Sequence, residues 1–174
     1  ELFGQFYSQS QATRLEITSI SEVTDQRVHH VSGSLTIASP VTSYSSVATI
    51  FIDGDLNINS NITSAASGAW VFVAGGNINI RDTVTQIDAV LISSGVICTS
   101  HNGTSCTGVP GSSQLRINGS LISLNRATPI RFTRQIVNTN IPSEIINAQP
   151  KYPVLLRGLF SRSIQKWSEI SSVD

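Results

Sequence analysis

Four aspartates carry most of the carboxyl chemistry in the repetitive part of this sequence: Asp53, Asp55, Asp82 and Asp88. Enzymes that cleave polysaccharides need two carboxyl groups gathered on one face of the protein. Asp53, Asp55 and Asn57 alternate as D-x-D-x-N, but the glycine and the acid that a calcium loop needs further along are absent. We therefore expect no catalytic residue, no metal and no cofactor, and a polysaccharide-degrading enzyme is only the third hypothesis.

Other signatures of catalysis are missing as well. The sequence has no G-x-S-x-G, no phosphate-binding loop and no H-E-x-x-H. His29 and His30 are adjacent in a strand-like stretch, where neighbouring side chains point to opposite faces. We expect one solvated and one half-buried imidazole that do not share a metal ion.

Two cysteines, Cys98 and Cys106, flank a loop of small and polar residues. We interpret them as a disulfide that pins an inserted loop, with two free thiols as the alternative. A disulfide indicates an oxidising compartment, so the predicted location is extracellular or at the cell surface. Within this loop Asn102 begins an N-x-[ST] sequence and is the candidate glycosylation site.

The composition narrows the classes of partner. The 174 residues have a formal net charge of zero, and only 13% of them are charged. Nucleic acids and anionic membranes attract cationic surfaces, so neither partner is expected. No run of 18 apolar residues is present, and membrane insertion is not expected either. A surface of Ser, Thr, Asn and Gln carries little charge repulsion and permits self-association.

A repeated pattern organises the chain and is clearest at 50–80. Alternating apolar residues, typical of a strand with one buried face, run into a glycine and continue after it. The pattern recurs about every 20 residues, and its glycines are Gly33, Gly54, Gly76, Gly95 and Gly119. This spacing predicts an all-β fold, a right-handed parallel β-solenoid of about five coils. The alternative is an antiparallel sandwich with hairpins at Asp53-Gly54 and Asn118-Gly119.

The pattern divides the chain into three parts. Residues 1–30 form an N-terminal extended strand and linker, 31–125 the solenoid, and 126–174 the last coil with a partly helical cap. The N-terminal strand either covers the first coil or pairs with another copy by donor-strand exchange. The residues assigned to this role are Leu2, Phe3, Phe6, Tyr7, Leu15 and Ile17.

The C-terminal third differs in character. Pro142 followed by Ser143 and Glu144 is typical of the start of a short helix. The leucines after 154 recur at near-helical spacing and indicate a cap over the last coil. Three arginines cluster before this proline. We interpret them as a solvated edge that discourages wrong strand pairing; the alternative is that they bind an anion or a partner's carboxylate. They are Arg126, Arg131 and Arg134.

Several segments resemble a family of uncharacterised bacterial cell-surface and appendage-associated β-solenoid proteins with glycine-punctuated coils. These segments are VATIFIDGDLNI, WVFVAGGNINI, TQIDAVLISSGVI, QLRINGSLISL and the ending PSEIINAQPKY…KWSEI. The similarity covers residues 47–170 and does not include the first 40 residues or the cysteine loop. The resemblance implies export and a structural or adhesive role, and it supplies no catalytic residues.

The sequence therefore predicts a protein that is not an enzyme. The first hypothesis is an extracellular structural subunit of a filament or layer that assembles with copies of itself through strand or coil stacking. The second is a carbohydrate-binding or adhesion module whose partner is a glycan.

Overall fold

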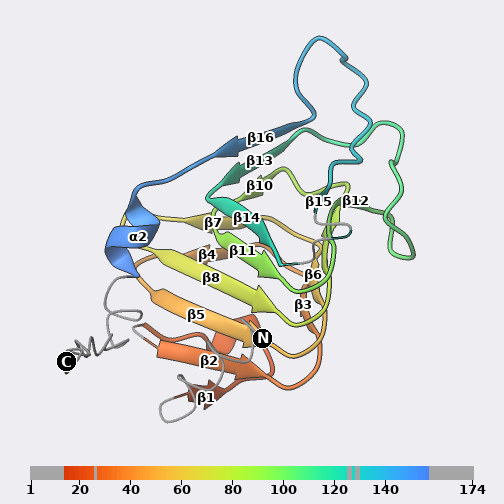
Figure 1. The fold of residues 1–174 in the computed structure, drawn as a ribbon. Coiled ribbons are helices and arrows are strands. Elements are labelled where there is room, and N and C mark those ends of the chain that lie inside the picture. Colours follow the sequence, from red (N-terminus) through yellow and green to blue (C-terminus); the bar gives the residue numbers. More distant parts are fainter. Residues whose placement is uncertain (1–13, 26, 125–126, 128–129, 157–174) are drawn as a thin grey trace, which may run out of the picture.

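The computed structural model describes residues 14–25, 27–124, 127 and 130–156, and most of their regular structure is β-strand. The strands form three sheets around one interior (Figure 1). In spatial order, sheet A holds β1 (Arg14–Glu16), β2 (Arg27–Val31), β5 (Val47–Ile52), β8 (Ala69–Ala74), β11 (Val90–Ser93) and β14 (Ser120–Ser123). Sheet B holds β3 (Leu35–Ile37), β6 (Leu56–Ile58), β9 (Ile78–Arg81), β12 (Ile97–His101) and β15 (Ile130–Arg131). Sheet C holds β4 (Val41–Ser43), β7 (Ile62–Ser64), β10 (Gln86–Ile87), β13 (Leu115–Asn118) and β16 (Glu144–Asn147).

Each turn of the chain contributes one strand to every sheet, and successive turns pair in parallel. Within the described residues, β2 to β16 make five such turns. The predicted β-solenoid is confirmed, and the sandwich with hairpins is wrong. Parallel strands need long connections, and here the other two sides of the coil provide them.

The interior consists of stacked apolar columns, because the alternating residues of each strand lie directly over those of the previous turn. In sheet C the column runs Val41, Ile62, Ile87, Ile117 and Ile146. In sheet B a comparable column starts at Leu35 and ends at Ile130. The aliphatic residues of the middle turns are fully buried, which is the main apolar contribution to stability.

Four of the five predicted glycines are equivalent. Gly33, Gly54, Gly76 and Gly95 stack at the corner between sheets A and B, and the amides of the last three donate to the previous glycine's carbonyl at 2.7–3.1 Å. Gly119 is not part of this ladder, so that prediction is wrong. It lies at the corner between sheets C and A, where a Cβ atom would come within 1.9 Å of the Ala89 carbonyl oxygen.

The N-terminal strand covers the solenoid of its own chain over the residues described. Strand β1 pairs in parallel with β2, and the 3-10 helix η2 (Ile20–Glu22) follows it. Ile17 is buried, whereas Leu15 is 45% exposed. The first turn of the solenoid begins with β2 at Arg27, within residues 1–30, which were expected to form the N-terminal strand and linker. The assigned residues Leu2, Phe3, Phe6 and Tyr7 lie outside the described residues.

The C-terminal part departs from one prediction. The expected helix start at Pro142–Glu144 leads instead into strand β16, because pairing with β13 places Ile146 over Ile117. A helix does occur later, α2 (Lys151–Leu155), whose Tyr152 and the following Leu156 pack on the outer face of sheet A. No helix among the described residues has the length and apolarity to cross a membrane.

Candidate functional site

The four aspartates considered for catalysis lie at three different corners of the coil. Asp53 and Asp55 follow β5 at the corner between sheets A and B, Asp82 follows β9, and Asp88 precedes β11. Among the described residues, no three His, Cys, Asp or Glu side chains are grouped in a way that could hold a metal ion. The arrangement does not gather these carboxylates on one face.

Asp88 is buried and has a structural role that the sequence did not indicate. Its carboxylate accepts hydrogen bonds from the Ser64 amide at 3.0 Å, from Asn118 Nδ2 at 2.7 Å and from Gln86 Nε2 at 2.9 Å. These donors belong to three successive turns of sheet C. The buried carboxylate thus ties neighbouring turns together.

The two adjacent histidines face opposite sides of β2, as expected, but both are buried, so the expectation of a solvated imidazole is wrong. His29 points inward, stacked in register with Ile50, and its Nε2 contacts the backbone of Thr24. Burial lowers the pKa of His29, because an imidazolium ion is poorly solvated in the interior.

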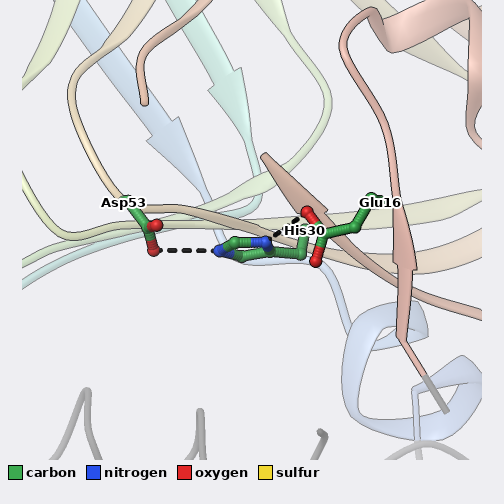
Figure 2. A network of polar contacts seen from close by, with 3 residues as sticks. All are labelled: Glu16, His30 and Asp53. Atoms are coloured by element: carbon green, nitrogen blue, oxygen red, sulfur yellow. Dashed lines mark hydrogen bonds and ion pairs between the residues drawn. The ribbon is translucent and has the colours of Figure 1, made fainter. Parts of the chain in front are cut away.

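His30 points outward and lies between two carboxylates from different turns (Figure 2). Its Nδ1 is 2.6 Å from Glu16 Oε2 on β1, and its Nε2 is 3.0 Å from Asp53 Oδ1. Burial alone lowers the pKa of His30, but the hydrogen bonds and charges of Asp53 and Glu16 outweigh it, so the pKa is raised. The imidazolium form therefore links β1 to the first two turns.

Among the described residues, the interior side chains of the last turn are only partly covered. Ile146 continues the interior column of sheet C, yet it is 44% exposed, whereas Ile117 below it is fully buried. Leu121 and Ile130, the last members of the columns in sheets A and B, are half-buried. In the part of the chain that the structure describes, no strand pairs with the outer edges of β14, β15 and β16.

Arg134 does not form a solvated edge, so that interpretation is wrong for this residue. Its side chain is buried and donates to four backbone carbonyls, those of Arg81, Asp82, Thr99 and Ser113, at 2.5–2.9 Å. Burial lowers the pKa of Arg134 to about 10, with Glu144 opposing the shift. Arg131 is exposed, as expected, and Arg126 lies outside the described residues.

The disulfide between Cys98 and Cys106 is present, with the two Cα atoms 5.7 Å apart. It holds the loop at 102–114, which follows β12 and projects from sheet B (Figure 1). Asn102 is in this loop and exposed, and its Oδ1 accepts hydrogen bonds from the amides of Thr104 and Ser105. The disulfide was predictable from the spacing of the cysteines and the small polar residues between them.

A polar groove of about 320 Å³ lies between this loop and the outer face of sheet B. Side chains from four turns reach it, and those with free polar groups are Asp55, Asn77, Asn79, His101 and Arg131. No motif in the sequence predicted this site. Its signal was the set of outward positions in register, Asn57, Asn79, Cys98 and Arg131, which becomes visible only when the turns are aligned.

Comparison with known proteins found no matching family model, no similar curated protein and no similar solved structure.

Proposed function

We propose that this chain is an extracellular structural module that builds a surface filament or layer by adding β-structure of one copy to the open end of another. The observation that carries the proposal is the exposure of Ile146 at an interior position of the last turn. A solenoid end with unpaired strand edges is a template for another strand. One added strand would extend one of the three sheets, and a whole added turn would cover the three apolar columns and extend all three sheets.

The surface supports close contact between copies. Charged residues make up only 13% of the sequence, and the formal net charge is zero. Repulsion between copies is therefore small, and apolar burial with backbone hydrogen bonds can dominate the association. The disulfide supports an oxidising compartment, where such bonds persist.

The segment that adds to the open end is expected to come from the N-terminus of another copy. Strand β1 is paired with β2 in its own chain, so an N-terminal donor strand would have to come from residues 1–13. In an extended donor strand Leu2 and Phe6 would face the open end together, and Phe3 and Tyr7 would face the opposite side.

The test compares Ile146→Lys with Val137→Lys in the whole chain. Ile146 is the last residue of the interior column of sheet C, whereas Val137 is 88% exposed in the loop before β16. Sedimentation velocity and negative-stain microscopy should show polymers for the unmodified chain and Val137→Lys, and monomers for Ile146→Lys. Circular dichroism melts check that both variants fold.

Deleting residues 1–13 separates the two modes of assembly. Loss of polymers in this deletion supports strand donation, whereas polymers that persist but are abolished by Ile146→Lys support direct stacking of turns. A chain that stays monomeric at all accessible concentrations, or an Ile146→Lys variant that polymerises normally, contradicts the proposal.

A further inference from the structure

We propose that the groove between sheet B and the disulfide loop binds a neutral hexopyranose unit of a glycan. This site is separate from the assembly proposed above, because it lies on the side of the coil. Its floor is the outward face of sheet B at Asn79 and Cys98, and one wall is the corner at Asp55, Asn77 and Val96. The other wall is the loop that the disulfide holds in place.

The corner wall carries polar groups in fixed orientations. Asp55 Oδ1 accepts the Asn77 amide at 2.7 Å, and Asn77 Oδ1 accepts the Val96 amide at 2.9 Å. Asn79 Nδ2 donates to Asn57 Oδ1 at 3.0 Å. Each side chain is held by one atom, and within the described residues Asp55 Oδ2, Asn77 Nδ2 and Asn79 Oδ1 make no other hydrogen bond. The acceptors Asp55 Oδ2 and Asn79 Oδ1 and the donor Asn77 Nδ2 are therefore held in fixed positions toward the groove.

Two further donors come from the other sides of the groove. His101 Nδ1 accepts the Gly103 amide at 3.0 Å, which in a neutral imidazole places the proton on Nε2. The guanidinium group of Arg131 is exposed and makes no hydrogen bond within the part of the chain described. The groove thus offers donors and acceptors together, which matches hydroxyl groups because each hydroxyl both donates and accepts.

The charges of the lining select against charged ligands. Asp55 and Arg131 contribute opposite charges to one groove, so neither a polyanion nor a polycation gains net attraction. Val96 and Cys106, both half-buried, provide a small apolar surface for the C–H face of a sugar ring. A shallow site of this size should bind a monosaccharide unit with a Kd of about 1 mM, strengthened by repetition in a polymer.

The test is binding of the whole oxidised chain to an array of neutral, uronate-containing and sulfated oligosaccharides, followed by NMR titration of the hits. The variants are Asp55→Asn, which keeps the Oδ1 acceptor, and Arg131→Gln. Each should weaken binding to neutral glycans at least tenfold. The matched control is Arg116→Gln, an exposed arginine on the outer face of sheet C, which should leave binding unchanged.

Repeating the titration in the Ile146→Lys background keeps the result independent of polymer formation. Reduction of the disulfide should also weaken binding, because the loop wall loses its attachment. The proposal is overturned if no neutral glycan binds at millimolar concentration, if only acidic oligosaccharides bind, or if Asp55→Asn and Arg131→Gln leave the affinity unaltered.

Discussion

The two ends of the solenoid differ in how they treat the same interior columns. At the N-terminal end, residues 14–25 fold across the first turn, and Ile17, Ile20 and Val23 pack against the interior. At the C-terminal end, Ile146 occupies an interior position but remains 44% exposed. Within the described residues, the chain itself closes the N-terminal end, whereas the C-terminal end has unpaired strand edges and partly exposed apolar side chains.

Polar contacts distinguish the ends as well. The closed end is held on its outer face by His30 between Glu16 and Asp53. The last turn is held instead by the buried Arg134, whose carbonyl partners come from the third and fourth turns. The final turn is therefore anchored through contacts with the turns that precede it.

The largest effect is expected from Arg134→Met. The substitution removes the donor to four backbone carbonyls, among which that of Thr99 belongs to a fully buried residue, and it removes the charge near the Glu144 carboxylate. We expect a loss of about 3–5 kcal/mol in the free energy of unfolding, measured by urea denaturation. Arg131→Met, at an exposed position in the same cluster, should change it by less than about 0.5 kcal/mol. Equal losses of unfolding free energy in the two variants would show that the hydrogen bonds of Arg134 do not anchor the last turn.

A pair of matched truncations tests the closed and open ends directly. Ile17→Ala removes atoms from a side chain that is 5% exposed, so the expected loss is about 2–4 kcal/mol. Ile146→Ala removes the same atoms where water already reaches them, and the expected loss is below about 1.5 kcal/mol. Both are measured by denaturation of the monomer. A larger loss at Ile146 would mean that the upper end is closed in solution.

The disulfide strengthens the fourth turn, just below the open end. Replacing both cysteines, as Cys98→Ala with Cys106→Ala, removes a crosslink between residues separated by 8 positions. The chain-entropy model gives a loss of about 2.5 kcal/mol in unfolding free energy. Thermal denaturation of the unmodified chain with and without reductant provides the control. A variant as stable as the oxidised chain would contradict this role.

The smallest effect is expected at His30, because Glu16 and Asp53 are 57% and 44% exposed and solvent screens their charges. The pKa of His30 is raised in the folded state. Its contribution to stability is therefore complete below the unfolded pKa of about 6.5 and is lost as the pH rises through the higher folded value.

The measurement for His30 is the difference in unfolding free energy between the unmodified chain and His30→Gln from pH 5.5 to 8.5. His29, whose lowered pKa has the opposite effect on stability, is present in both proteins and cancels. The difference should decrease with rising pH. A difference that is flat or increases with pH would rule out the charged link.

Much of the fold could be predicted because its determinants are local. Alternation of apolar residues in Leu56–Ile58 and Ile78–Arg81 fixes which side of each strand is buried, whatever the neighbours. At the corner between sheets A and B, a Cβ atom on Gly54, Gly76 or Gly95 would come within 3.0 Å of the previous glycine's carbonyl group, and the regular spacing of these glycines in the sequence indicates this close approach. The disulfide could be predicted for the same reason, because Cys98 and Cys106 are only 8 positions apart in the sequence.

Other features could not be read from the sequence, because they depend on the register in which successive turns stack. Gly119 follows the same local pattern as Gly95 but lies at another corner, because residues 102–114 lengthen the fourth turn. Glu144–Asn147 forms a strand because β13 is beside it. The burial of Arg134 and the placement of His30 between Glu16 and Asp53 have the same origin. Each of these features requires contacts between residues of different turns. The free energy of such contacts is gained only when the turns stack, so no single segment of the sequence reveals it.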